Sequence, residues 1–217
     1  MDNKLIYEST FRDDEVYRKI DNKYENYWYI RMKRVFDIVC SVLAIIILFP
    51  VIIIVFLLIK LESKGPAIFK QVRSGRYGKP FYIYKFRSMK VNTPNIATND
   101  FVNSDKYITK VGKVIRKTSI DEIPQLFNIL KGEMSIVGPR PVILEEEDLI
   151  SLRAEYNIDN LYPGITGWAQ INGRDNIDNK EKVKYDYEYL INRSLKFDFY
   201  IIIKTVLKVI QRSDIKD

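Results

Sequence analysis

The stretch IVCSVLAIIILFPVIIIVFLLI, from Ile38 to Ile59, decides what kind of fold this chain can have. It contains 22 residues and no charged side chain, which is long enough for a helix to cross the hydrocarbon core of a bilayer. So long and uniformly apolar a segment is not typical of a helix in the core of a soluble domain. We therefore expect this segment to lie in a membrane.

The path of this segment through the membrane is open on the sequence alone. Pro50 divides it into twelve residues before the proline and nine after it, and a proline inside a helix removes a hydrogen bond and kinks the chain. Both flanks are basic, so the excess of positive charge on cytoplasmic loops does not choose an orientation. Two half-helices that return to the same face and a single kinked span both fit these observations. The basic flanking residues are Arg31, Lys33, Arg34, Lys60 and Lys64.

The composition excludes several kinds of chemistry. The chain of 217 residues has no histidine and one cysteine, Cys40, within the apolar segment. Histidine acid–base catalysis, zinc sites made of Cys and His, Cys-His nucleophiles and intramolecular disulfides are therefore excluded. Catalysis would have to use Asp, Glu, Lys, Arg, Tyr or a hydroxyl group. A metal ion would be a hard cation held by oxygen, and Mg²⁺ is the one we expect.

Positive charge is concentrated directly after the apolar segment. The net charge of the chain is +7, and residues 60–120 contain fourteen Lys and Arg against three acidic residues. Such a segment needs a partner such as phosphate, anionic lipid or nucleic acid. Within it, residues 68–72 and 81–86 read as two short strands around a turn with two glycines, which predicts a small β-hairpin.

Two adjacent carboxylates, Asp121 and Glu122, follow the basic segment. Apolar residues at 123, 126, 127 and 130 have the spacing of a helix with one buried face. We expect this helix to begin at Ser119 or Asp121 and to end at Lys131-Gly132. Its amino-terminal end would then favour anions and metal-bound phosphates beside the two acids. Ordinary acidic residues in a solvated first turn are the simpler interpretation of the pair.

The remaining segments are mainly helical or loop-like. The pattern predicts a basic helix at 107–117, an acidic helix from 145 to about 156, and helix again from 180 onward, with apolar positions along one face that lies against the bilayer or the catalytic core. Residues 163–174 are rich in glycine, which would let the backbone approach a ligand closely; an ordered loop without a ligand is the alternative interpretation of this segment. Gln170 and Arg174 in this segment could donate hydrogen bonds to such a ligand.

Several motifs in this order resemble one protein family. They are Lys33-Arg34-Val-Phe-Asp37 before an apolar run with a proline in its middle, Lys85-Phe-Arg87-Ser-Met89, Ser119-Ile-Asp121-Glu122-Ile-Pro124-Gln125, Gly138-Pro139-Arg140-Pro141 and Pro163-Gly164-Ile-Thr-Gly167-Trp168. Together they are similar to the bacterial sugar transferases, which are monotopic polyprenyl-phosphate phosphoglycosyl transferases. The resemblance covers about residues 32–213.

The resemblance implies transfer of a sugar-1-phosphate from a UDP-sugar to polyprenyl (undecaprenyl) phosphate with release of UMP, as the first membrane step of glycan assembly. Asp121 would be the nucleophile and form a covalent phosphosugar intermediate, and Glu122 would assist, with Mg²⁺ bound at the same two carboxylates. Cations suit the phosphates of the donor. The candidates for contacts with the phosphates and the nucleotide are Lys85, Arg87, Arg116, Arg140, Gln170 and Arg174.

The expected architecture is α+β and mainly helical. We expect residues 1–31 to form a polar arm and residues 32–61 a membrane helix broken at Pro50, which the family resemblance implies is re-entrant. Residues 62–217 should form a compact cytosolic catalytic domain with a small β-hairpin and interfacial helices. We expect the domain at the cytoplasmic face of the bacterial inner membrane, with no nucleic acid partner and with the oligomeric state open. The competing hypothesis is a membrane-anchored scaffold whose basic segment holds anionic lipid or nucleic acid.

Overall fold

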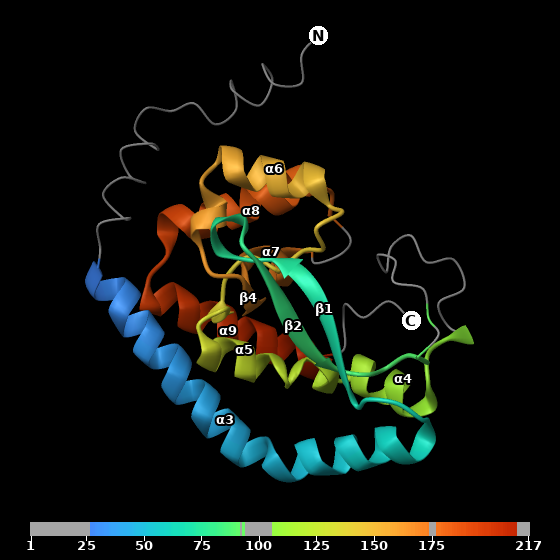
Figure 1. Ribbon diagram of the computed structural model, residues 1–217. Coiled ribbons are helices and arrows are strands. Elements are labelled where there is room, and N and C mark those ends of the chain that lie inside the picture. The colour runs from blue at the N-terminus through green and yellow to red at the C-terminus, as the bar shows by residue number, and fades with distance from the viewer. Residues whose placement is uncertain (1–26, 92, 94–105, 174–176, 212–217) are drawn as a thin grey trace.

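The structure is a computed structural model that describes residues 27–91, 93, 106–173 and 177–211. Most of the polar arm and Arg174 therefore lie outside the described residues. The described part is mainly helical with two small sheets, as expected for the α+β class (Figure 1). Its helices are α3 (Tyr27–Glu62), α4 (Lys110–Lys117), α5 (Gln125–Lys131), α6 (Glu147–Glu155), α7 (Trp168–Asn172), α8 (Asn179–Asn192) and α9 (Leu195–Gln211), and its strands are β1 (Ile68–Ser74), β2 (Pro80–Phe86), β3 (Ser135–Val137) and β4 (Gly164–Thr166).

Helix α3 contains the whole apolar segment in 36 residues, with Pro50 inside it. It runs down one side of the molecule and then turns to run along the bottom (Figure 1). A proline in the helix interior accounts for such a bend because it removes one helical hydrogen bond. In the part of the chain that the structure describes, α3 is the single helix long and apolar enough to cross a membrane, by length and composition. Most of its apolar side chains are exposed.

Both halves of α3 pack against the same body of helices and strands. In the first half, Lys33 lies 3.0 Å from Asp198 in α9, and the guanidinium of Arg34 donates to the backbone oxygen of Ile129 at 2.7 Å. In the second half, Val55 and Ile59 are buried. They belong to an apolar cluster with Ala67, Phe86 and Ile115. The two ends of the helix are thus fixed to one domain.

The predicted β-hairpin is confirmed and is longer than expected. Strands β1 and β2 are antiparallel over seven residue pairs, from Ile68 opposite Phe86 to Ser74 opposite Pro80. Because side chains alternate between the faces of a strand, Phe81, Ile83 and Lys85 share one face. Ile83 is buried against α5 and β3, so this face points into the domain.

A short parallel sheet joins two loops that are far apart in sequence. Strand β3 pairs with β4, with Ser135 opposite Gly164 and Val137 opposite Thr166. Neither segment was predicted to be a strand. A side chain at Gly138 would bring its Cβ to 2.2 Å from the backbone oxygen of Tyr162, so glycine is required for the chains to cross this closely.

The carboxyl-terminal helices complete the domain. The acidic helix is confirmed as α6, and it packs with α8 around a core that includes Leu149, Val183 and Leu190. Helix α9 buries Ile201 and Asp198 and exposes an apolar face. The exposed apolar residues of α9 are Phe199, Tyr200, Ile203, Val206, Leu207 and Val209.

Candidate active site

The two adjacent carboxylates lie in a short 3₁₀ turn, Ile120–Glu122, that precedes α5. The prediction that the helix begins at Ser119 or Asp121 is therefore wrong, and so is the placement of both acids at its first turn. Ser119 adopts the left-handed conformation with φ of 56°, and Pro124 is the residue that caps α5. The predicted end is confirmed, since Gly132 follows the helix with φ of 83°.

The buried face of α5 also differs from the prediction. Leu126 and Ile129 are buried, whereas Phe127 is 45% exposed. The helix is shorter than expected and is approached by β2 and α3, so tertiary contacts choose the face. Asn128 is fully buried, and its side chain pairs with the backbone of Tyr82 and Tyr84. These contacts fix α5, and with it the preceding turn, to the hairpin.

Three cations from three segments surround the acidic pair. The ammonium of Lys85 in β2 lies 2.8 Å from Oε1 of Glu122, and Nη2 of Arg140 lies 3.4 Å from the same oxygen. Arg116, in the last turn of α4, is close enough to Asp121 to stabilise its charged form. The structure thus brings together five of the predicted site residues.

Asp121 has a strongly perturbed acidity. Burial and the neighbouring charge of Glu122 raise its pKa from 3.8 to about 6, although Lys85, Arg116 and Arg140 attract the ionised form. The carboxylate is therefore still mostly ionised at pH 7, but it is poorly solvated. Perturbed groups of this kind are typical of functional sites.

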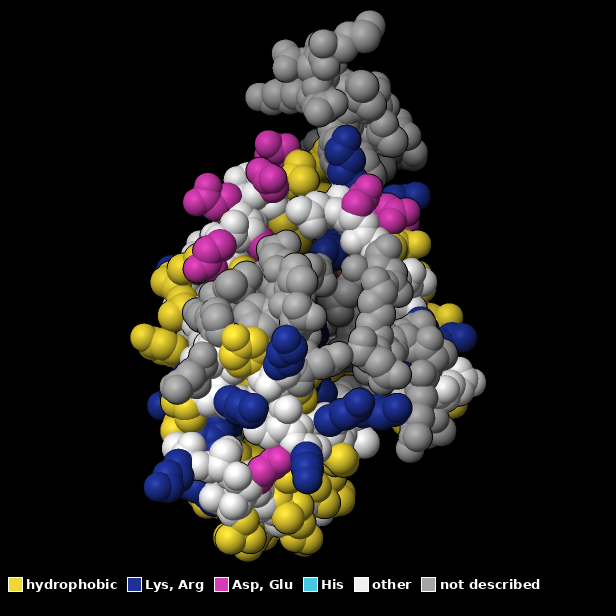
Figure 2. Space-filling view, turned by 90° about the vertical axis from the view of Figure 1, so that its right-hand side faces the viewer, with side chains coloured by type: hydrophobic (Ala, Val, Ile, Leu, Met, Phe, Trp, Pro, Cys, Tyr) yellow, Lys and Arg dark blue, Asp and Glu magenta, His cyan; other side chains and the backbone are white. Residues whose placement is uncertain are grey.

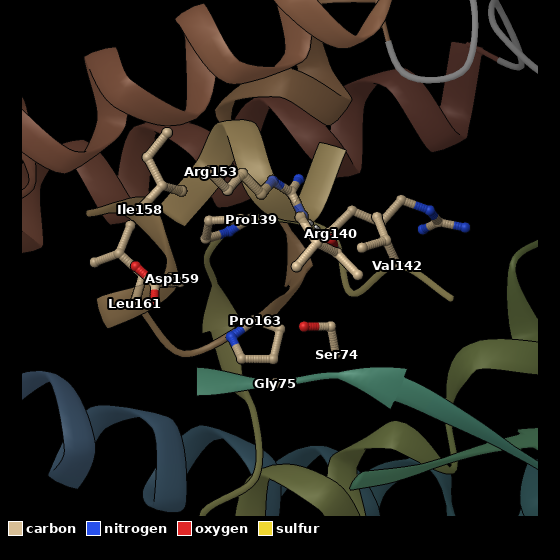
Figure 3. Close-up of a pocket in the computed structure, with 11 residues that line it drawn as sticks. Ser74, Gly75, Pro139, Arg140, Val142, Arg153, Ile158, Asp159, Leu161 and Pro163 are labelled. Carbon is tan, nitrogen blue, oxygen red and sulfur yellow. Dashed lines mark hydrogen bonds between the residues drawn. The ribbon is translucent and has the colours of Figure 1, made fainter. Parts of the chain in front are cut away.

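A buried ion pair between Arg153 and Asp186 supports the backbone at Arg140. The guanidinium of Arg153 donates to the backbone oxygen of Arg140 at 2.8 Å and to Oδ2 of Asp186 at 3.0 and 2.6 Å. Figure 3 shows Arg153 and the Pro139-Arg140 backbone on one side of a pocket that Ser74 and Gly75 border on the other. Sequence reasoning missed this pair, because Arg153 and Asp186 are 33 residues apart in the chain.

Two glycines of the glycine-rich segment pack against another part of the chain, as the ordered-loop interpretation expects. The nearest atoms to Gly164 and Gly167 belong to the backbone of Gly138, so these glycines accommodate another part of the chain. The backbone N–H of Gly138 donates to the backbone oxygen of Thr166 at 2.9 Å, and the backbone N–H of Gly164 donates to that of Pro139 at 2.8 Å. Together these contacts fix the loop that carries Arg140.

Two further predicted contacts are placed as follows. The guanidinium of Arg87 donates to the backbone oxygens of Ser63 and Lys64, so it closes the carboxyl-terminal end of α3. The amide nitrogen of Gln170 donates to Ile165 at 3.4 Å, while its oxygen is buried without a hydrogen-bond partner among the described residues. Neither residue has a contact with the acidic pair that would assign it to the site.

The acidic pair fits a magnesium ion that is bound by the protein and by a substrate together. Among the described residues, no group of three or more Cys, Asp or Glu side chains gathers as a metal cluster. Mg²⁺ is commonly held by one or two carboxylates together with substrate phosphates and water. Asp121 and Glu122 supply such a set, and a cation there would offset the charge of Glu122, which adds to burial in raising the pKa of Asp121.

The structure thus combines a group of two acids and three cations with a helix that is long and apolar enough to cross a membrane, which is the class of protein that the site and the fold define. The sequence model of one family, described as bacterial sugar transferase, matches residues 28–212. The chain belongs to this family.

Individual relatives agree with this assignment. The UDP-glucose:undecaprenyl-phosphate glucose-1-phosphate transferase of Escherichia coli K12 is 44% identical over 184 residues, which cover 82% of this chain and 40% of the relative. The undecaprenyl-phosphate galactose phosphotransferase of Salmonella typhimurium is 40% identical and shares 83% of this chain and 41% of its own length. The sugar transferase EpsL of Bacillus subtilis, described as uncharacterized, is 39% identical, and 87% of it is covered. The chain thus spans about two fifths of the first two relatives.

Proposed function

We propose that this protein transfers a sugar-1-phosphate from a UDP-sugar to a polyprenyl phosphate such as undecaprenyl phosphate, and releases UMP. The observation that carries the proposal is the poorly solvated Asp121–Glu122 pair between Lys85, Arg116 and Arg140. It offers a carboxylate nucleophile and cations for a diphosphate in one place. The names of the E. coli and Salmonella relatives support the donor and acceptor classes.

The reaction takes two displacements at one phosphorus atom. A carboxylate oxygen of Asp121 attacks the phosphorus that carries the sugar, the bond to the bridging oxygen breaks, and UMP leaves with the electron pair. An oxygen of the polyprenyl phosphate then attacks the same phosphorus and displaces the carboxylate. No external proton donor is required, and a covalent intermediate divides one difficult step into two.

The surrounding side chains have separate roles in this scheme. Lys85 and Arg140 neutralise charge on the phosphoryl oxygens, and Arg140 suits bidentate contact. Glu122 orients both cations through its Oε1. Asp121 and Glu122 are also the residues that would hold Mg²⁺, which when bound offsets the charge of the diphosphate.

The proposal includes a helix α3 that enters and leaves the membrane on one face. Contacts of both its halves with one domain support this topology, since a single crossing would separate those contacts. On the face in Figure 2, hydrophobic side chains gather at the bottom and most Lys and Arg side chains lie just above them, whereas most acidic side chains lie near the top. Such layering suits a protein resting on an anionic bilayer. We place the domain at the cytoplasmic face.

The function is tested by measuring UMP release from a panel of UDP-sugars, with and without undecaprenyl phosphate. We expect release with at least one donor, and mass spectrometry of quenched enzyme should show a sugar phosphate on Asp121. Asp121→Asn should abolish both signals. Absence of transfer with every donor, together with salt-dependent binding of nucleic acid, would favour the scaffold hypothesis instead.

The topology is tested by cysteine labelling. In a Cys40→Ser background, Lys64→Cys places a thiol on an exposed residue just after α3. We expect a membrane-impermeant maleimide to label it only after the cells are permeabilised. Labelling in intact cells would place this end of α3 outside the cytoplasm and refute the proposed topology.

A further inference from the structure

A hollow next to the acidic pair is lined by three cations. It measures about 230 Å³, counting the space open to solvent, and its walls are Arg73, Ile83, Lys85, Gln125, Arg140 and Pro141. No acidic side chain among the described residues lines it. Two of its cations, Lys85 and Arg140, are those that contact Glu122, so the hollow adjoins the Asp121–Glu122 pair.

We propose that Arg73 completes a phosphate-binding subsite with Lys85 and Arg140, which holds a substrate phosphate next to the one that reacts with Asp121. This inference rests on the proposed function and adds to it a binding residue that no motif assigns. The bound group is a phosphate with one or two negative charges. It comes from the nucleotide side of the donor or from the polyprenyl phosphate, and the experiment below separates these sources.

The position of Arg73 follows from strand pairing. Arg73 lies opposite Phe81 in the hairpin, and Phe81 is on the same face of β2 as Lys85. Arg73 and Lys85 are therefore directed to one side of the sheet. Ser74 N donates to the backbone oxygen of Val142 at 2.9 Å, which draws the end of β1 against the segment that follows Arg140.

Arg73 keeps hydrogen-bonding capacity in this position. Its Nη2 donates to the neutral amide oxygen of Gln71 at 2.6 Å, while Nε is shielded from solvent and has no hydrogen-bond partner among the described residues. A buried donor without a partner is costly and is usually satisfied when a ligand or water arrives. A guanidinium presents its donors in a fork that matches phosphate.

The excess positive charge around Arg73 also favours binding of an anion. Burial and the like charge of Arg140 lower the pKa of Arg73 to about 10, and Glu146, Glu122 and Glu145 oppose this only in part. Glu122 is already shared by Lys85 and Arg140. A phosphate in the hollow would offset the repulsion between the two guanidiniums.

The test compares Arg73→Gln with Lys70→Gln. Lys70 is three residues earlier in β1 on the opposite face, and it is exposed, so its variant loses the same charge outside the hollow. Calorimetry with magnesium pyrophosphate and with UMP measures phosphate binding directly. We expect Arg73→Gln to weaken binding by about 10- to 100-fold, Arg73→Lys to be intermediate, and Lys70→Gln to match the wild type.

Steady-state kinetics identify the source of the phosphate. A higher KM for the UDP-sugar alone assigns the subsite to the donor, and a higher KM for undecaprenyl phosphate alone assigns it to the acceptor. If folded Arg73→Gln binds pyrophosphate and UMP as the wild type does, or if the wild type binds neither, the subsite is refuted. Wild-type binding that depends on Arg73 without any transfer would uphold the subsite and refute the proposed function.

Discussion

Replacing Asp121 with asparagine should stabilise the protein at neutral pH while it removes the proposed nucleophile. The pKa of Asp121 is raised from 3.8 to about 6, so the folded state disfavours its ionised form. At about 1.4 kcal/mol per pKa unit this difference approaches 3 kcal/mol. Asp121 is partly exposed, and solvent screening reduces the expected gain to about 1–3 kcal/mol. Asparagine has the shape of the acid without its charge.

The pH dependence of this gain has a definite sign. A carboxyl group with a raised pKa contributes stability that is fully present below its unfolded pKa, near 4, and that is lost as the pH rises through about 6. The wild type therefore carries the full penalty above pH 6. The advantage of Asp121→Asn should be largest at pH 7.5 and should disappear below pH 4.

Urea unfolding in detergent micelles at pH 7.5, 5 and 4 measures both effects. Glu155→Gln is the matched control, because Glu155 is an exposed acid at the end of α6, and its loss should change the free energy of unfolding by less than about 0.5 kcal/mol. An Asp121→Asn protein that is no more stable than the wild type at pH 7.5, or a gain that does not vary with pH, would refute the reasoning.

Three further outcomes are expected. At limiting Mg²⁺, kcat/KM should fall as the pH drops below about 6, the raised pKa of Asp121. This acid limb should move to lower pH as the Mg²⁺ concentration rises, because the cation stabilises the ionised carboxylate. An acid limb that does not move with Mg²⁺ would argue against a site shared by the metal and Asp121. Gly138→Ala should cost about 1–3 kcal/mol in unfolding free energy, because its Cβ would meet backbone at 2.2 Å, and should lower kcat by displacing the Arg140 loop; an active, stable variant in a thermal and kinetic assay would contradict this. Arg153→Met should cost about 3–5 kcal/mol because it leaves the buried Asp186 unpaired, and Arg153→Met with Asp186→Asn should recover most of that loss in the same denaturation assay; no recovery in the double variant would count against the pair.

The hairpin and the acidic helix could be predicted from the sequence because their signals are local. Alternating strand residues around a two-glycine turn predicted β1 and β2, and the acidic run predicted α6. The start of α5 could not be predicted in this way. A helix pattern at 123–130 does not show that Ser119 turns left-handed and that Pro124 caps the helix. Element boundaries depend on such single-residue conformations.

Charged partners were the least predictable feature. Lys33 stands four residues from Asp37, yet it pairs with Asp198, and Asp37 instead accepts the backbone N–H of Ile136 at 3.1 Å. Arg73 could have been placed beside Lys85 from the hairpin register, since both follow one face of the strands. Nothing local connects Arg153 to Asp186.

The sequence by itself determined the membrane-compatible helix, the absence of histidine chemistry, the family and the acidic pair with its basic surroundings. These follow from composition, length and motifs, which need no knowledge of folding. Only the tertiary structure decided which cations reach Glu122, why Gly138 and Gly164 must be glycine, and that Arg73 lines the hollow beside them. The physical reason is that electrostatic and steric contacts depend on distance in space, and β3, β4 and the hairpin bring together residues that are far apart along the chain.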